Sequence, residues 1–558
     1  MRADPSELLQ QGQDALNRGE NARALNIFSN LVKIGPHSVG AWCGYAASLY
    51  GSGRFERALS AAKEAVRLGP DDFRTYSVLA PPAFLMDCEV GIQTCRDYIL
   101  TLSRNDAESL AGFWSSRLAE KDHFIAAARA FSFFAERYLD EEDTAHELAH
   151  HYLNAQELDK VEDLLGVIEK NFGDSAAALC MRARIEIIRG DAKAAKAAAL
   201  KAIELNARAI PAYVILSELS PELVDASIEE RLKKALDEGA LPDEMRIGGY
   251  RALGRAAEKK GDFNAAFDAF DAAKRLAKSA AESSGRVYRA AAVERRARLA
   301  IARYPAAPSS AAMESAPPDC VFIVGMPRSG STLIDQVVSS HSRAVSIGES
   351  ANMAQIANSL EAQAKSAGRA WRSCVADARE HYRSAYRNAA AGAACVLDKN
   401  LFNFERCGLI ADLDPGARFI AMQRDPADIA MSVFRTRFLA AHEWSNDLRD
   451  IAHMQATYEF LIERWRRILG ERIHVVKYEE LVSDFETGVR AVLDFCGLDL
   501  EQQCLEYYKG DRTVFTVSAV QVRRPINADG VARWRGYEKR LAPFFQSLEE
   551  FRRRYAQS

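Results

Sequence analysis

Residues Val321–Leu333 read VFIVGMPRSGSTL, and this stretch decides how the second half of the chain is interpreted. An apolar run rich in β-branched side chains stops at Gly325, a short loop continues to Gly330, and helical spacing of apolar residues begins after Ser331. A strand, a glycine-bounded loop and a helix N-terminus in this order gather backbone N–H groups and direct the positive end of a helix dipole at a ligand. The stretch therefore predicts an anion-binding loop.

The loop differs from the nucleotide motif G-x-x-x-x-G-K-[ST] at one position, because Ser331 stands where the lysine would be. Kinases and ATPases use that lysine, with Mg²⁺, against a polyphosphate. Here the cation lies within the loop as Arg328, whose guanidinium suits a fork-like grip on a less highly charged anion. The stretch resembles the 5′-phosphosulfate loop of sulfotransferases that use 3′-phosphoadenosine 5′-phosphosulfate (PAPS). A degenerate P-loop or a chance Gly/Ser turn is the alternative. The resemblance implies that the donor is bound by Arg328, Ser329, Gly330, Ser331 and Thr332.

Length and composition set the outer limits. A chain of 558 residues is too long for one core, and its net charge of −4 argues against general nucleic-acid binding. The N-terminal residues contain no apolar signal segment, and no run approaches the length of a membrane span. The ten cysteines form neither a CxxC pair nor a Cys/His cluster. We therefore expect a cytoplasmic protein of two or more domains, with no metal, no nucleic-acid partner and no membrane contact.

A repeat with a period of 34 residues marks the first half. Gly19, Ala24, Leu25, Gly35 and Pro36 recur as Gly53, Ala58, Leu59, Gly69 and Pro70. This period and the small residues at helix contacts resemble the tetratricopeptide family. A late copy of the pattern contains Leu253, Gly254, Gly261, Ala266 and Phe270, and residues 208–245 contain a shifted or atypical pair.

These patterns divide the chain into three parts. We expect a tetratricopeptide array over residues 1–280, a connecting helix and Pro/Ala/Ser-rich linker over 281–318, and a transferase domain over 319–558. The concave face of such an array binds a peptide or protein in many repeat proteins. A role as spacer, dimerisation surface or packing partner is equally open, so a homodimer is a further expectation.

Short apolar runs alternate with helical patterns beyond the linker. This βα alternation predicts a mainly parallel sheet with helices on both faces, so the expected fold is an all-α tetratricopeptide superhelix followed by an α/β P-loop-like domain. Ligands of such sheets bind beyond the carboxyl ends of the strands. The expected strands are Val321–Val324, Ala344–Ile347, Cys395–Leu397, Arg418–Gln423 and Ile473–Val476.

A second candidate anion site follows the fourth of these strands. Arg424 stands directly after it, Asp425 is a good helix N-cap, and Pro426 is a good first helical residue. Ser432 lies about two helical turns further, so it and Arg424 can converge on one phosphate. The spacing resembles the sulfotransferase pattern in which an arginine, with a serine eight positions later, holds the 3′-phosphate of the donor. A capped helix with a surface arginine is the alternative.

Two further segments resemble the same family. Tyr478, in VKYEEL after the fifth expected strand, matches a tyrosine that lies near the donor nucleotide, although a tyrosine at a strand end often serves the core. The basic segment near the C-terminal end resembles the closing segment of tyrosylprotein sulfotransferases, with Arg533 and Trp534 at its basic–tryptophan pair. The resemblance implies that Arg523, Arg524 and Arg533 fold over the nucleotide; a solvated arginine-rich surface is the alternative.

Sulfuryl transfer needs a base for the acceptor proton and a cation for the leaving phosphate. Glu349 is our candidate base, because it follows the second expected strand and Gly348 allows a tight turn. It also matches a Gly-Glu pair of the protein-tyrosine members, whereas an exposed strand-end glutamate is the alternative. Lys399 is the candidate for stabilising the leaving group together with Arg328, and a surface ion pair with Asp398 is the alternative. Ser518 occupies the position of a family serine that contacts the bridging oxygen.

The resemblance therefore implies an enzyme that transfers a sulfuryl group from PAPS to a hydroxyl acceptor. The leading acceptor is a protein or peptide tyrosine, which the repeat array would hold, and a carbohydrate or small molecule comes next. A P-loop kinase or NTPase, which would need a replacement for the missing lysine, remains an alternative of another class. A non-catalytic interaction protein that only retains the nucleotide is the other.

Overall fold

The computed structural model describes residues 4–18, 20–119, 123–238, 241–306, 319–350, 352–367, 371–390, 392–438, 442–509 and 525–557. Ser518, Arg523 and Arg524 lie outside these ranges, as does most of the expected linker. Contacts within the chain divide it into two compact units, Met1–Ile215 and Leu216–Ser558. This division falls within the repeat region, well before the end of the array expected from the sequence.

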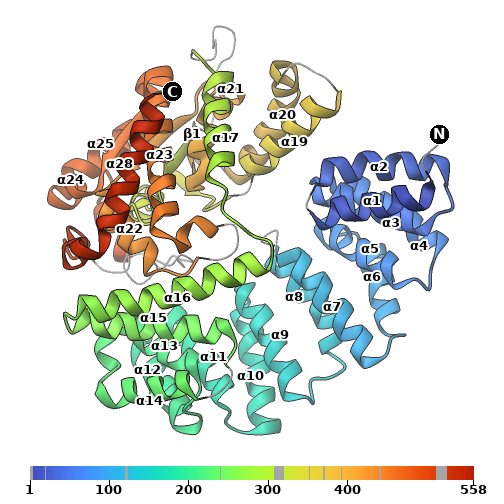
Figure 1. The fold of residues 1–558 in the computed structure, drawn as a ribbon, viewed down its shortest axis with the longest axis horizontal. Helices are drawn as coiled ribbons and strands as arrows, with labels where there is room; N and C mark the ends of the chain where they lie inside the picture. Colours follow the sequence, from blue (N-terminus) through green and yellow to red (C-terminus); the bar gives the residue numbers. More distant parts are fainter. Residues whose placement is uncertain are drawn as a thin grey trace. The chain divides into compact units, whose positions relative to one another are not determined.

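The first unit consists of helices that pack as successive pairs, α1 with α2 through α11 with α12 (Figure 1). Alanines fill the contacts between paired helices, since Ala58, Ala62 and Ala199 are fully buried. Helix α13 (Ile210–Leu219) crosses the division between the units. The paired helices are α1 (Pro5–Asn17), α2 (Asn21–Ile34), α3 (Val39–Gly51), α4 (Phe55–Leu68), α5 (Phe73–Leu85), α6 (Glu89–Ile99), α7 (Arg104–Ala119), α8 (Phe124–Ala135), α9 (Glu142–Asn154), α10 (Leu158–Phe172), α11 (Ala176–Arg189) and α12 (Ala192–Leu205).

The second unit begins with helices of the same repeat region. After the short η1 (Pro221–Leu223) and α14 (Ala226–Asp237), which form the atypical part of the array, α15 (Asp243–Lys259) and α16 (Phe263–Ser283) form a regular pair. Helix α17 (Ala290–Arg303) follows. The side chains of Phe267 and Phe270 on α16 belong to the same hydrophobic core as Phe322 and Phe419 of the sheet. The last pair of the array is therefore built into the sheet domain.

All five strands expected from the sequence form, and they make one sheet in the order β2-β3-β1-β4-β5 with every pairing parallel. The prediction of a parallel α/β domain is confirmed. The alternation of side chains along β1 fills both faces: Val321 and Ile323 pack in one core, and Phe322 and Val324 in the other. The strands are β1 (Asp319–Gly325), β2 (Ala344–Ser346), β3 (Cys395–Asp398), β4 (Arg418–Gln423) and β5 (Ile473–Lys477).

Helices cover both faces of this sheet, with α18 and α25 on one side and α21 and α23 on the other. In the ranges that the structure describes, no helix combines the length and the apolar composition that crossing a membrane would need. The helical segments of the domain are α18 (Ser331–Ser339), α19 (Asn352–Ala367), α20 (Trp371–Ala390), η2 (Leu401–Arg406), α21 (Cys407–Leu413), α22 (Pro426–Phe434), η3 (Glu443–Asn446), α23 (Leu448–Leu469), η4 (Gly470–Arg472), α24 (Tyr478–Ser483), α25 (Phe485–Cys496), α26 (Gln502–Leu505), η5 (Tyr507–Lys509), η6 (Arg533–Leu541) and α28 (Ala542–Ala556).

Candidate active site

The loop between β1 and α18 has the backbone conformation of an anion cradle. Arg328 and Gly330 both have positive φ angles, +72° and +97°, and α18 begins at the next residue, Ser331. Left-handed backbone is strained for an arginine, and such strain is concentrated at functional sites. Gly330 must also lack a side chain, because a Cβ atom there would lie 2.6 Å from the ring of Tyr478. The loop and Tyr478 are thus held in close contact.

The turn after β4 lies against the same loop and Tyr478. Asp425 caps α22 by accepting the N–H groups of the helix's first turn, as the sequence predicted. Arg424 donates from Nη1 to the Arg328 carbonyl oxygen at 2.8 Å, and its guanidinium lies 4.5 Å from the ring centroid of Tyr478. Arg328 in turn donates from Nε to Ser432 Oγ at 3.0 Å. The structure therefore brings together Arg328, Arg424, Ser432 and Tyr478, which come from three separate segments of the sequence.

One cavity of about 260 Å³ lies at this junction. Ser329 is fully buried in the loop beneath it. Arg435, which the sequence analysis did not single out, is a further cation on the wall. The predicted donor-binding residues that line the cavity are Arg328, Gly330, Ser331, Thr332, Arg424, Ser432, Tyr478 and Arg533.

The cavity is strongly cationic. Burial, and then the nearby guanidinium groups of Arg435 and Arg424 in that order, lower the pKa of Arg328 to about 10. A buried group of like charges is costly unless an anion offsets it. Two buried polar atoms, Ser329 Oγ and Arg424 Nε, have no hydrogen-bond partner within the described parts of the chain. These residues fit a ligand that carries acidic groups.

A carboxylate from the helical array supports this wall. Glu258 on α15 accepts hydrogen bonds from Arg435 Nη1 at 3.0 and 3.1 Å, from Arg533 Nη2 at 2.7 Å and from the Tyr537 hydroxyl at 2.8 Å. Glu258 is itself buried, with 8% of its surface exposed. The sequence gives no sign of this role, because a glutamate near the end of an amphipathic repeat helix is ordinarily solvated.

The C-terminal segment closes over the start of α22. Asp428 accepts the backbone N–H groups of Ala532 at 2.7 Å and Trp534 at 3.0 Å, and Asp425 accepts the indole N–H of Trp534. Arg424 also donates from Nη2 to the carbonyl oxygen of Gly530. Arg533 is thereby fixed at the cavity wall. The part of the segment that includes Ser518 lies outside the described residues, so its predicted role stays a prediction.

Glu349 and Lys399 form an ion pair, Nζ to Oε1, of 2.6 Å. The loops that carry them are joined by hydrogen bonds, from the Lys399 N–H to the Gly348 carbonyl at 2.8 Å and from the Asn400 side chain to the Ser350 carbonyl at 2.8 Å. Lys399 is almost fully buried, whereas 61% of the Glu349 side chain is exposed and reachable from solvent.

This pair lies at the same sheet edge as the anion cradle, because β2, β3 and β1 are neighbouring parallel strands. Lys399 pairs with Glu349 rather than with the adjacent Asp398. Asp398 is turned inward, where it accepts the Tyr386 hydroxyl at 2.6 Å, and its burial raises its pKa to about 6. No group of three or more His, Cys, Asp or Glu side chains in the described ranges is arranged to hold a metal ion.

Comparisons with known proteins bear on the same region. Residues 318–502 match the family model described as "Sulfotransferase family". An uncharacterized protein of Aquifex aeolicus (strain VF5) is 29% identical over 366 residues, which cover 63% of this chain and 48% of that protein. Protein-tyrosine sulfotransferase A of Caenorhabditis elegans is 22% identical over 232 residues, or 39% of this chain and 61% of that protein. The chain thus matches 48% and 61% of the lengths of these two relatives.

Among solved structures, the sulfotransferase domain from the Synechococcus PCC 7002 olefin synthase is similar to this chain at 18% identity with a TM-score of 0.30. That match covers 41% of this chain and 90% of the solved domain. The region that matches the sulfotransferase family model, residues 318–502, thus contains the strand–loop–helix turn of the site, and it follows an array of paired helices.

Proposed function

We propose that this chain transfers a sulfuryl group from PAPS to a hydroxyl acceptor. The observation that carries the proposal is the cavity in which Arg328, Arg424 and Ser432 meet behind a strand–loop–helix turn that lacks the P-loop lysine. A cradle at a helix N-terminus and a separate arginine–serine pair suit a nucleotide with two acidic ends better than a triphosphate chain.

In this proposal each predicted residue has a defined contact. The loop from Ser329 to Thr332, with the first turn of α18, holds the phosphosulfate end of the donor. Arg424 and Ser432 hold the 3′-phosphate, and Tyr478 and Arg533 lie along the nucleoside. When bound, the donor supplies the sulfuryl group and a phosphate leaving group.

The ion pair of Glu349 and Lys399 supports the assignment of the proton and charge transfers. Glu349 accepts the proton of the acceptor hydroxyl, since its carboxylate is accessible at the sheet edge. Lys399 Nζ orients this carboxylate and, with Arg328, offsets the negative charge that develops on the leaving phosphate. Ser518 would add a contact to the bridging oxygen.

The leading acceptor is a protein or peptide tyrosine, with a carbohydrate or small molecule next. Similarity to a protein-tyrosine sulfotransferase supports this order. The helical array, taken from the sequence as residues 1–280, would hold a peptide or protein acceptor, because arrays of this kind offer an extended binding surface. A long tyrosine peptide should then have a lower KM than a short one around the same tyrosine.

The test of donor identity uses the purified full chain with two labelled donors. With PAPS labelled in its sulfate, we expect label to move to a tyrosine peptide, a glycan or a small phenol. With ATP labelled in its γ-phosphate, we expect no transfer. Calorimetry should show that 3′-phosphoadenosine 5′-phosphate (PAP) binds far more tightly than ATP·Mg. Transfer of the γ-phosphate, or tighter binding of ATP·Mg, would replace this proposal by the kinase reading.

The test of the base is the substitution Glu349→Gln, which preserves shape and removes the proton acceptor. We expect the transfer rate to fall by roughly 10²–10⁴-fold while PAP affinity stays unchanged. Glu480→Gln is the matched control, because Glu480 also follows a strand of this sheet but forms an exposed pair with Lys477. An unaltered transfer rate in Glu349→Gln would remove Glu349 from this role.

A further inference from the structure

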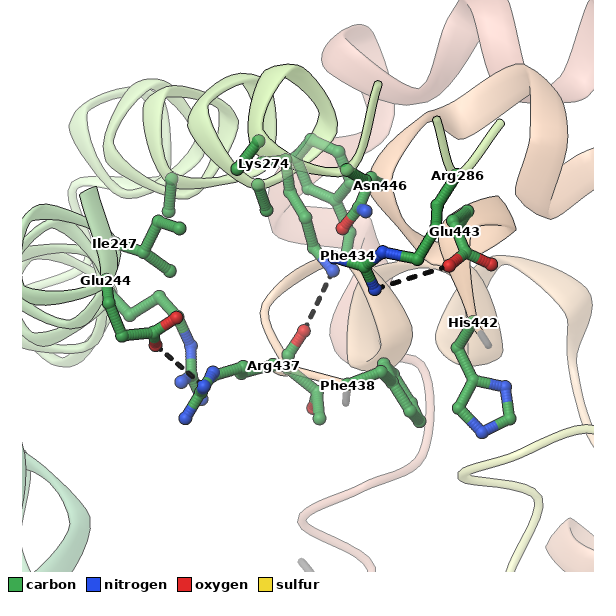
Figure 2. Close-up of a pocket in the computed structure, with 16 residues that line it drawn as sticks. Glu244, Ile247, Lys274, Arg286, Phe434, Arg437, Phe438, His442, Glu443 and Asn446 are labelled. Atoms are coloured by element: carbon green, nitrogen blue, oxygen red, sulfur yellow. Dashed lines mark hydrogen bonds and ion pairs between the residues drawn. The ribbon is translucent and has the colours of Figure 1, made fainter. Parts of the chain in front are cut away.

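A second cavity, of about 230 Å³, lies between the last helical pair and the segment that follows α22 (Figure 2). Ile247 on α15 and Lys274 on α16 form one wall, and Phe434, Arg437 and Phe438 form the wall that faces them. All of these residues belong to the second compact unit. Neither the sequence motifs nor the proposed donor site accounts for this cavity.

Two buried cations line it. Lys274 Nζ donates to the Thr436 carbonyl oxygen at 2.8 Å, and Arg251 Nε donates to the Arg435 carbonyl oxygen at 3.4 Å. Only 4% of Lys274 and 8% of Arg251 is exposed. In the described ranges, neither cation has a carboxylate within 4.0 Å, the limit for an ion pair. Each cation therefore has N–H donors that are not engaged by a carboxylate.

The carboxylates on the rim are already engaged. Glu244 pairs with Arg437 at 2.8 Å, and Glu443 pairs with Arg286 at 3.5 Å. Figure 2 shows both pairs at the edges of the cavity, with the Lys274 amine directed at the carbonyl between them. The carboxylates thus offset the two rim arginines, and the charge of the two buried cations remains uncompensated.

Electrostatics supports the same view. Burial, and to a smaller extent the nearby Arg251, lower the pKa of Lys274 to about 7. Burial likewise lowers the pKa of Arg251 to about 9. Removing unpaired cations from water is costly, and an anion in the cavity would offset that cost.

The rest of the wall is apolar. Ile247, Ala273, Ala277, Phe434 and Phe438 surround the space next to the cations. We propose that this cavity is a binding site for an organic anion, with its acidic group on Lys274 and Arg251 and a small apolar body against Ile247, Phe434 and Phe438. The site is separate from the proposed donor site and does not depend on the identity of the donor.

The two sites share one piece of backbone. Ser432 and Arg435 line the first cavity, whereas Phe434, Thr436 and Arg437 line the second. The Thr436 hydroxyl donates to the Ser432 carbonyl oxygen at 2.7 Å, and the backbone carbonyl oxygen of Thr436 accepts from Lys274. An anion that engages Lys274 therefore acts on the end of the helix that carries Ser432.

The experiment is calorimetric titration of the full chain with phenyl phosphate, in the presence of saturating PAP so that the first cavity is occupied. We expect one bound phenyl phosphate, and a roughly ten- to hundredfold loss of affinity in Lys274→Met and in Arg251→Met. Lys278→Met is the matched control, because Lys278 lies one turn further along α16 and is paired with Asp447 at 2.8 Å. Its affinity should equal that of the wild type.

A second readout separates binding from folding. At pH 8 Lys274 is largely neutral, so phenyl phosphate binding should take up close to one proton, which titrations in buffers of different ionisation enthalpy measure. Lys274→Met should take up none. The other charged or titratable groups that face the cavity are Glu244, Arg251, Arg286, Arg437, His442 and Glu443.

Three results would overturn the assignment. The first is that the wild type does not bind phenyl phosphate. The second is that the wild type, Lys274→Met and Arg251→Met bind it equally well. The third is that the wild type binds inorganic phosphate, which lacks the apolar body, with the same affinity as phenyl phosphate. Inhibition kinetics then identifies the source of the anion. Competition with the acceptor assigns the site to an acidic group of the acceptor, and inhibition or activation without competition assigns it to a separate organic anion.

Discussion

The helical pairs α1–α12 and the pair α15–α16 are built on one repeat but have different interiors. In both regions a glycine allows a phenylalanine to approach the neighbouring helix: a Cβ atom on Gly44 would lie 2.2 Å from the ring of Phe28, and one on Gly254 would lie 2.5 Å from the ring of Phe270. Within the described ranges of α1–α12, no Asp, Glu, Lys or Arg side chain is buried. The pair α15–α16 instead buries Arg251, Glu258 and Lys274.

The difference shows how the interior of a helical repeat changes when the repeat packs against another domain. Paired helices that pack only on other repeats need apolar and small residues in their contacts, so buried charge would be destabilising there. The pair α15–α16 shares its core with the sheet. Arg251 and Lys274 line one cavity of the second unit, and Glu258 contacts Arg435 and Arg533 on the wall of the other. Glu258 compensates the arginines of one cavity, and Lys274 with Arg251 forms the cationic wall of the other.

The largest expected effect comes from removing one buried aromatic ring from the core of each region in turn. Phe131→Ala on α8 and Phe270→Ala on α16 each remove a fully buried ring, so each should lower the free energy of unfolding of its own unit by about 3–5 kcal/mol. Only Phe270→Ala should lower the stability of the unit that PAP stabilises. Urea denaturation with and without PAP identifies that unit by the unfolding transition that PAP stabilises. If both variants lowered the stability of this transition equally, the proposed difference between the two regions would be wrong.

Glu258→Gln tests whether the buried charge of Glu258 supports the proposed donor site. The glutamine can still accept from Tyr537, but Arg435 and Arg533 lose their anionic partner. We expect the unit to lose about 3 kcal/mol of stability without PAP, the low end for breaking a buried pair. Glu162→Gln on α10, whose partner Arg189 is largely exposed, should cost less than about 1 kcal/mol. Equal losses in urea denaturation would contradict the assignment.

The pH dependence of stability should differ between the two regions, first through Lys274. Its pKa is about 7 in the folded chain because of burial, against about 10.4 for an unfolded lysine. Between these pH values the unfolded chain binds more protons, so stability rises with pH, by up to about 1.4 kcal/mol per unit. Lys274→Met should flatten this rise in denaturation curves collected from pH 7 to 10, whereas Lys278→Met should leave it in place.

The first unit should show a weaker dependence at lower pH, through His151 on α9. Burial, and then the neighbouring His150, lowers the His151 pKa to about 4, against about 6.5 when unfolded. The unfolded chain binds more protons between these values, so stability falls as the pH drops from about 6.5 to about 4. This window is narrower than that of Lys274, so the total change is smaller. His151→Gln should abolish it, and a fall of the same size in this variant would exclude His151 as the cause.

Most of the fold followed from local patterns. The strands after the linker could be predicted because each is a short β-branched run bounded by turn residues, and parallel pairing followed from their alternation with helices. The cluster of Arg328, Arg424, Ser432 and Tyr478 could be expected for a related reason. Each residue stands just after a strand, and the carboxyl ends of parallel strands meet at one edge of the sheet.

The contributions of Glu258, Arg435, Arg251 and Lys274 could not be predicted in the same way. The sequence pattern around a charged residue on a repeat helix is the same whether that face of the helix is exposed to solvent or buried against another domain. The sequence by itself determined the helical repeat, the parallel sheet and the anion cradle, because these depend on spacing along the chain. The tertiary structure alone decided that the last repeat pair lies against the sheet domain and supports two cavities there, because burial of a charge depends on which distant segment covers it.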